Sequence, residues 1–139
     1  MSLKDFFLND KFAALSGCEL IDIKPGWATA RMKVEPKHLN AAGGCQGGAL
    51  FTLADFAFAA AVNSHGRVTV SVDSSIAIHK SVSSGWLYAT ATETLDHRKL
   101  PFCIVEIKDE QGNLIATFTG LAYRFPDNDP RNQILPSLD

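Results

Sequence analysis

The sequence predicts an α+β domain in which one antiparallel β-sheet wraps around one long helix. The segment from Gly47 to Val62 is apolar apart from a single charged residue, Asp55. A helix that is apolar on nearly all sides is buried. Most other periodic segments alternate apolar and polar residues, as half-buried strands do. A sheet of such strands can bury its inner face against the helix.

The size and charge of the chain exclude several classes of protein. With 139 residues we expect a single domain, 1–139, that is large enough for a real core. The net charge of −2 and the absence of a long basic run argue against nucleic-acid binding. Charged residues among the first eleven argue against a signal peptide. The apolar segment is short for a membrane span and has Asp55 near its centre, so we expect no membrane partner.

The first third of the chain predicts a helix and a hairpin. Residues 2–5 resemble a capping box, and we expect one amphipathic helix within 1–17, closed by Gly17. Leu20 to Lys24 and Trp27 to Val34 are predicted to form a hairpin around Pro25-Gly26. The glycine-rich turn and the long helix follow, and His65-Gly66 is predicted to end the helix.

Four strands are predicted after the long helix. They cover 68–80, 86–96, 102–108 and 114–125, with turns at Ser83-Ser84-Gly85 and 109–113. The first of them places its apolar residues on one face. The tail 126–139 is rich in Pro, Asp and Asn, and we expect it to be loose. One sheet on one helix leaves an edge strand open, so pairing of two chains is expected.

The cysteines and histidines indicate a reduced protein without a metal. Cys18, Cys45 and Cys103 are an odd, widely spaced set, which fits a cytoplasmic location. Cys45 is interpreted as a packing residue. The four histidines lack metal-ligand spacing, so neither a metal nor another cofactor is predicted. The sequence His97-Arg98-Lys99 fits a solvated loop, with binding of coenzyme A phosphates as the alternative.

The residues around the start of the long helix indicate hydrolysis of an activated acyl group. The glycine-rich turn 43–48 leads into the helix, whose first amides are free and carry partial positive charge. Such amides can hold a developing oxyanion. Asp55 is then a candidate general base or nucleophile. Asn40 and Ser71 are candidates for positioning water or the acyl group.

The spacing of Gly47 and Asp55 implies a site shared between chains. They are eight residues apart, which is about 12 Å along one helix. The two cannot both touch one carbonyl carbon. If both act in one reaction, each must come from a different chain, and a two-fold dimer would hold two such sites.

These residues resemble the hotdog-fold acyl-CoA thioesterases of the phenylacetate-degradation (PaaI) type. The resemblance covers roughly 19–125 and rests on His38 and Asn40, then Gln46-Gly47-Gly48, then Asp55 nine residues after Gln46. It implies a hotdog fold and an acyl-CoA thioester hydrolase that gives free carboxylic acid and coenzyme A. It also implies a homodimer, often a homotetramer.

The resemblance also implies roles for individual residues. Gly47 supplies the oxyanion amide, Asp55 is base or nucleophile, and Asn40 orients water or substrate. Gln46 belongs to the catalytic group, and Gly48 and Ser71 contact the substrate. The sequence departs from the family at Gln46, where histidine is usual, because Gln donates a hydrogen bond but cannot carry a proton.

Less specific interpretations remain beside these. Asp55 can be a structural hydrogen-bonding residue, and Asn40 a simple turn residue. Gln46 can equally make a structural hydrogen bond, and serine is ordinary on a strand. The rival function is a non-catalytic acyl-CoA or small-ligand binding protein of the same fold, in which Gln46 marks lost chemistry. Hydratase activity is disfavoured because no histidine accompanies Asp55.

Overall fold

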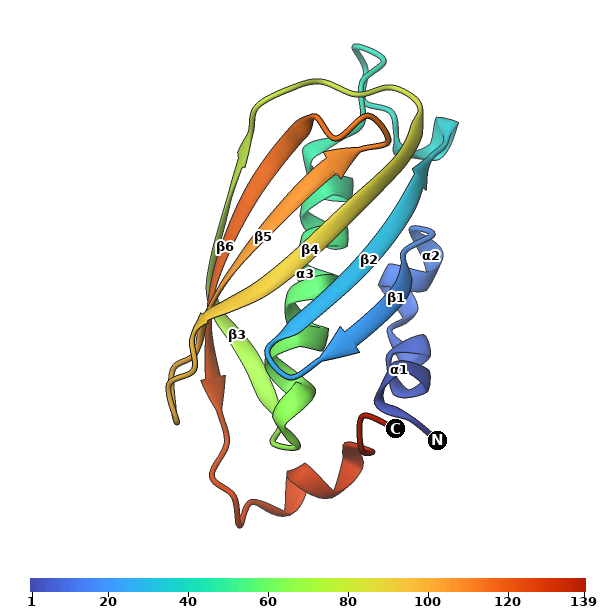
Figure 1. Cartoon of the computed structure of the whole chain (residues 1–139). Helices are drawn as coiled ribbons and strands as arrows, with labels where there is room; N and C mark the ends of the chain where they lie inside the picture. Colours follow the sequence, from blue (N-terminus) through green and yellow to red (C-terminus); the bar gives the residue numbers. More distant parts are fainter.

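The fold consists of one six-stranded antiparallel sheet curled around one long helix, as predicted (Figure 1). The computed structural model describes all residues, 1–139. The strand order is β1-β2-β4-β5-β6-β3, and every neighbouring pair is antiparallel. The strands are β1 Glu19–Lys24, β2 Trp27–Val34, β3 Thr69–Ile78, β4 Gly85–Leu95, β5 Phe102–Asp109 and β6 Leu114–Arg124.

The long helix α3 spans Gly47–Val62 and continues as a 3₁₀ turn, η3, over Asn63–His65. Gly66 follows with a left-handed φ of 81°, which suits glycine and ends the helix as expected. By length and composition alone the segment Gly47–His65 could cross a membrane. In this fold it is the core helix: 61% of its most apolar 18-residue stretch is buried, and Phe58 and Leu53 are almost fully enclosed.

The N-terminal segment differs from the single helix that we expected. It forms α1 over Leu3–Phe6, a 3₁₀ turn over Phe7–Asn9, and α2 over Lys11–Leu15. The capping box at Ser2 is present, but Asp10 starts a second helix because its side chain accepts a hydrogen bond from Ala13 N. An aspartate that caps a new helix interrupts the preceding one.

Strand β3 forms one edge of the sheet, and its apolar residues are not buried within the chain. The ladder with β6 shifts register between Ser71 and Asp73. Val70, Val72 and Ile78 are 43%, 54% and 49% exposed. The alternating pattern over 68–80 therefore predicts the strand correctly, but the apolar face of this strand is not buried within the chain. An exposed apolar edge strand of this kind is suited to pairing with another chain.

The C-terminal segment packs against the body, unlike the loose tail that we expected. It includes a 3₁₀ turn, η4, over Pro130–Ile134. Asn132 Oδ1 accepts a hydrogen bond from Val68 N at 2.7 Å, and Leu3 N donates to Ser137 O at 2.8 Å. The two chain ends therefore lie close together (Figure 1). Leu135 and Leu138 contact the core, which composition alone did not reveal.

Candidate active site

The loop that leads into α3 is held in place by Asn40. Its Oδ1 accepts hydrogen bonds from Ala42 N at 2.9 Å and Gly44 N at 3.1 Å. Its own backbone exchanges bonds with Gly44 O and Gly43 N, and Gly43 takes a left-handed φ of 89°. Asn40 is thus a turn residue, as the simpler interpretation had it. Its Nδ2 makes no hydrogen bond within the chain, so the amide can still donate to a ligand.

Buried His38 braces the same loop. Its Nδ1 accepts from Glu35 N at 2.9 Å, and its Nε2 lies 2.6 Å from Ser16 O. The neutral ring with the proton on Nε2 satisfies both contacts. His38 therefore ties the loop to the end of α2, and its part in the His-x-Asn pattern is structural.

Helix α3 opens with free amides at Gly47 and Gly48. Neither amide makes a hydrogen bond within the chain. Gln46 is the N-cap residue, but its side chain accepts no capping bond. A Cβ on Gly47 would lie 3.1 Å from Ile78 Cδ1, so any larger side chain would crowd the approach to this amide. The helix start can therefore bind an oxyanion.

Asp55 is a half-buried carboxylate without a partner. It lies on the least buried stripe of α3, with Gly48, Thr52 and Ala59. Its side chain makes no hydrogen bond or ion pair. Burial raises the pKa of Asp55, and the negative charge of Asp10 adds to the rise. A carboxylate held out of water with no donor is prepared to take a proton.

The structure brings some of the predicted residues together and separates others. Asn40 and Gly47 line one cavity of about 280 Å³. Gln46 and Gly48 line a second of about 470 Å³, beside His38 and Thr52. Asp55 lines neither cavity.

Ser71 is likewise absent from both cavities. It lies exposed on the edge strand β3, with its Oγ 3.0 Å from Ser74 Oγ. One chain alone therefore does not assemble the whole predicted site.

Two basic residues that the sequence analysis did not assign to the site lie beside Gly47. His79 and Lys80 line the same cavity. His79 is fixed by its backbone bond to Ile115 O and by Nε2 at 2.9 Å from Thr117 Oγ1. Lys80 makes no ion pair. The signal available in the sequence was a basic pair at the end of a predicted strand.

The cysteines are unsuited to nucleophilic chemistry. Burial raises the pKa of Cys18 and of Cys103 to about 12, and it also raises that of Cys45. The thiolate, not the thiol, is the nucleophile, and a raised pKa keeps these cysteines in the thiol form. All three are free and buried, so Cys45 is a packing residue even though it lines the cavity with Gly47.

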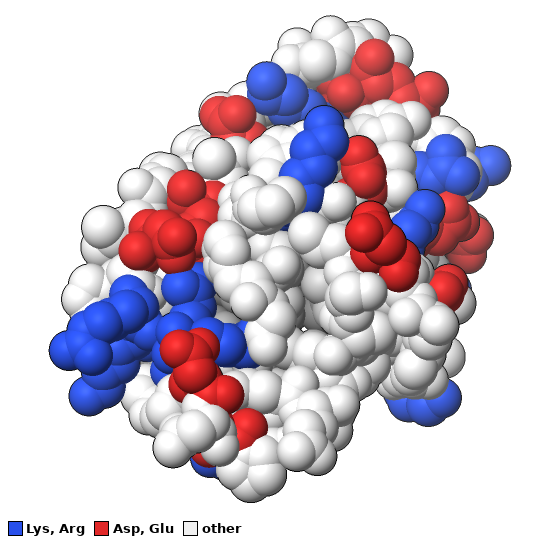
Figure 2. Space-filling model, turned by 60° about the horizontal axis from the view of Figure 1, so that its bottom comes forward, with Lys and Arg blue, Asp and Glu red and all other residues white.

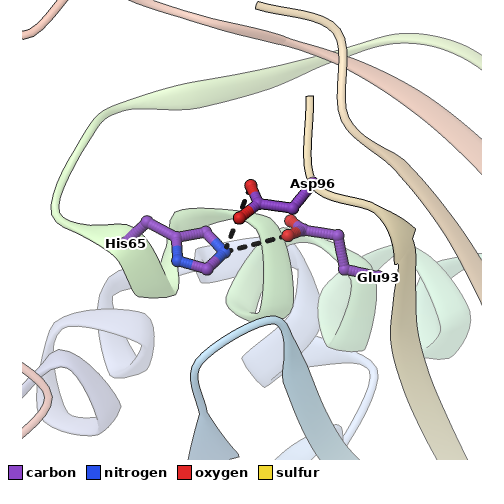
Figure 3. A group of neighbouring side chains, drawn as sticks. All are labelled: His65, Glu93 and Asp96. Carbon is purple, nitrogen blue, oxygen red and sulfur yellow. Dashed lines mark hydrogen bonds and ion pairs between the residues drawn. The ribbon is translucent and has the colours of Figure 1, made fainter. Parts of the chain in front are cut away.

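One group of potential metal ligands lies at the far end of α3. His65 Nε2 and oxygens of Glu93 and Asp96 lie within 4.8 Å of one another (Figure 3). Arg124 already pairs with both carboxylates, at 3.1 Å to Glu93 and 2.7 Å to Asp96. A metal ion here would face the guanidinium charge. The arrangement is that of an ion-pair network in which Glu93 and Arg124 are buried and Asp96 is exposed.

Comparison with known proteins identifies the family. Residues 22–123 match the family model described as the acyl-CoA thioesterase C-terminal domain. The chain belongs to the PaaI-like hotdog thioesterases. The resemblance and the fold predicted from the sequence are thus confirmed.

Several relatives are similar to this thioesterase-family chain over most of its length. The acyl-coenzyme A thioesterase PaaI of Escherichia coli is 34% identical over 117 residues, covering 84% of each chain. A protein of Archaeoglobus fulgidus, named only as a candidate esterase, is 38% identical over 130 residues, 92% of this chain and 84% of its own.

Solved structures agree with this assignment. The E. coli PaaI protein from the phenylacetic acid degradation operon aligns with a TM-score of 0.82 and 30% identity, over 90% of this chain and 97% of its own. The TT0310 protein of Thermus thermophilus aligns with a TM-score of 0.80 and 32% identity, over 84% and 99%.

Proposed function

We propose that this protein hydrolyses acyl-CoA thioesters to a free carboxylic acid and coenzyme A. The observation that supports this most directly is the unpartnered carboxylate of Asp55 on a helix that begins with free amides at Gly47 and Gly48. Membership of a thioesterase family supports the same reaction class. The reaction needs only water, so no cofactor is included in the proposal. Three free cysteines fit a reducing, cytoplasmic location.

Each residue has a defined role in this mechanism. The Gly47 amide donates to the thioester carbonyl oxygen and stabilises the oxyanion. Asp55 takes a proton from the attacking water, or attacks the carbonyl carbon itself. The free Nδ2 of Asn40 and the side-chain amide of Gln46 orient water or substrate. Gly48 and Ser71 contact the substrate. Collapse of the intermediate breaks the C–S bond, and the thiolate takes up a proton to leave as the coenzyme A thiol. Where Asp55 is the nucleophile, water then hydrolyses the acyl-aspartyl anhydride and releases the free acid.

The proposed active unit is a homodimer, which can assemble further into a homotetramer. Gly47 and Asp55 of one chain are about 12 Å apart along α3, too far to act on one carbonyl. Neither of the two cavities that contain Gly47 or Gln46 includes Asp55. The exposed edge strand β3, with Val70 and Val72, is the surface that would join two copies. Each site then combines Gly47 of one protomer with Asp55 of its partner.

A hydrolysis screen tests the reaction. Purified protein is incubated with aryl-acetyl, benzoyl and medium-chain acyl-CoAs, and the released thiol is measured. Turnover of any of these supports the proposal. Binding of acyl-CoA without turnover across the panel would favour the alternative, a non-catalytic acyl-CoA binding protein. The observation that favours this alternative is Gln46, which stands where histidine is usual and cannot carry a proton.

Complementation tests the shared site. Asp55→Ala and Gly47→Val should each be nearly inactive alone. A mixed dimer contains one doubly altered site and one intact site, so activity should recover towards half of wild type in the mixed fraction. If subunit exchange is verified by mass and no activity returns, each chain has its own complete site.

A further inference from the structure

The larger of the two cavities at the start of α3 has one wall from the N-terminal segment. It measures about 470 Å³ and contains Gln46 and Gly48. Phe12 of α2 lies on one wall, and Gly48, Ala49 and Thr52 of α3 lie on another. A segment that precedes the whole sheet thus borders the space beside the free amides of the candidate oxyanion site.

The wall from α3 consists of small residues. Gly48 has no side chain, and Ala49 has a single methyl group. Thr52 Oγ1 donates to Gly48 O at 2.8 Å, so its hydroxyl is used inside the helix and its methyl group remains for contact with a ligand. These residues leave a space between α2 and α3 that larger side chains would fill.

Two polar side chains from the loop before α3 also line the larger cavity, and both are bonded within the chain. The two ring nitrogens of His38 have partners. Lys37 Nζ donates to Leu15 O at 3.0 Å and lies 3.6 Å from Glu35 Oε2. Because these groups have partners of their own, an apolar ligand that enters the cavity leaves neither of them unpaired.

Phe12 is the largest apolar residue that lines the larger cavity, and it is 64% exposed. The helix that carries it is fixed at both ends. Asp10 caps the start of α2, and Ser16 O at its other end lies 2.6 Å from His38 Nε2. An exposed ring on a fixed helix can bind an apolar group with little loss of entropy.

The smaller cavity, which measures about 280 Å³ and contains Gly47, has a different character. Asn40 Nδ2 and Lys80 Nζ are free donors among its lining residues. The far end of the molecule, where α3 finishes, carries basic and acidic side chains side by side (Figure 2). Both places suit polar groups, so the larger cavity is the better site for an apolar one.

We propose that the larger cavity binds the acyl group of the substrate, and that Phe12 determines how well an extended apolar acyl chain is bound. The inference rests on the proposed function. A thioester whose carbonyl oxygen is held by the amides of Gly47 and Gly48 directs its acyl chain and its sulfur to different sides. At about 30 Å³ for a water-sized group, the larger cavity has room for about fifteen such groups, which accommodates an eight-carbon chain.

The test measures binding of coenzyme A thioethers, which are not hydrolysed. Calorimetry compares coenzyme A, S-ethyl-coenzyme A and S-octyl-coenzyme A on wild type, Phe12→Ala and Ala49→Leu. The first variant removes an apolar wall and the second fills the space, so each should weaken binding of S-octyl-coenzyme A about tenfold. Binding of coenzyme A and of S-ethyl-coenzyme A should be unchanged in both variants.

Leu15→Ala is the matched control. Leu15 is 71% exposed on the same helix and does not line the larger cavity, so its loss should leave S-octyl-coenzyme A binding unchanged. Wild-type affinity of Phe12→Ala for S-octyl-coenzyme A would overturn the proposal. An equal loss for all three ligands would also overturn it, because the cavity would then bind the coenzyme A arm. The expected binding pattern without turnover of octanoyl-CoA would support the acyl site and refute the hydrolytic function.

Discussion

Asp55 and Glu93 are two carboxylates that the same fold withdraws from water, and burial raises the pKa of each. Glu93 has two basic partners: Oε1 lies 2.9 Å from His65 Nε2 and Oε2 lies 3.1 Å from Arg124 Nη2. Both contacts oppose the rise in its pKa. Asp55 has no such partner, and the charge that acts on it, that of Asp10, is also negative.

The difference separates a structural acid from a chemical one. A buried charge whose oxygens are all bonded holds its neighbours in place, and its loss is felt in stability. A half-buried charge with free oxygens destabilises the fold slightly and keeps its reactivity. The first three of the following predictions test this distinction between Asp55 and Glu93, and the fourth concerns Gln46.

Replacement of Asp55 by asparagine should give the largest effect, on activity. We expect kcat for acyl-CoA hydrolysis to fall by about a hundredfold to ten-thousandfold, because asparagine cannot accept the proton. Thiol release by the purified variant measures this, and Glu93→Gln is the matched amide control. Turnover by folded Asp55→Asn at the wild-type rate would remove Asp55 from the mechanism.

Replacement of Glu93 by alanine should give the largest effect on stability. The free energy of unfolding should fall by about 3 kcal/mol, because Arg124 stays buried with one of its two carboxylates gone. Asp96→Ala, at a side chain that is 64% exposed, should cost at most about 1 kcal/mol. Urea denaturation measures both, and equal losses would contradict the structural role assigned to Glu93.

The same Asp55→Asn variant should be more stable than wild type at neutral pH, by about 1 kcal/mol. The pKa of Asp55 is raised in the folded state, so the fold favours its protonated form. The stability that it contributes is fully present below the unfolded value of 3.8 and is lost as pH rises through the folded value.

The gain in stability of Asp55→Asn over wild type should therefore be absent at acid pH and should appear as pH rises. Denaturation at a series of pH values checks this, with Asp22→Asn as the control at an exposed aspartate on β1. A stability difference that is the same at every pH would show that Asp55 is not the titrating group.

Replacement of Gln46 by histidine should give the smallest effect. Both residues donate a hydrogen bond, and the Gln46 side chain is exposed and makes no capping bond. We expect acyl-CoA turnover to be preserved or raised. A loss of activity in the folded variant would show that the glutamine carbonyl has a role that imidazole cannot fill.

The sequence by itself determined the features that depend on neighbouring residues. The apolar run with Asp55 gave α3, the two-residue alternation gave the strands, and Ser2 gave its capping box. The free amides at Gly47 followed from the glycine-rich turn before a helix. Such features depend on spacing within one element, so a single chain segment contains the information.

Only the tertiary structure decided the features that join distant segments. The bonds of Arg124 to Glu93 and of His65 to Glu93 span 31 and 28 residues, and no local pattern indicates them. The same holds for Lys80 beside Gly47 and for the packed tail at Asn132. The partners of a buried charge depend on which strands become neighbours. The fold as a whole therefore determines which of two buried acids is bonded and which stays free to react.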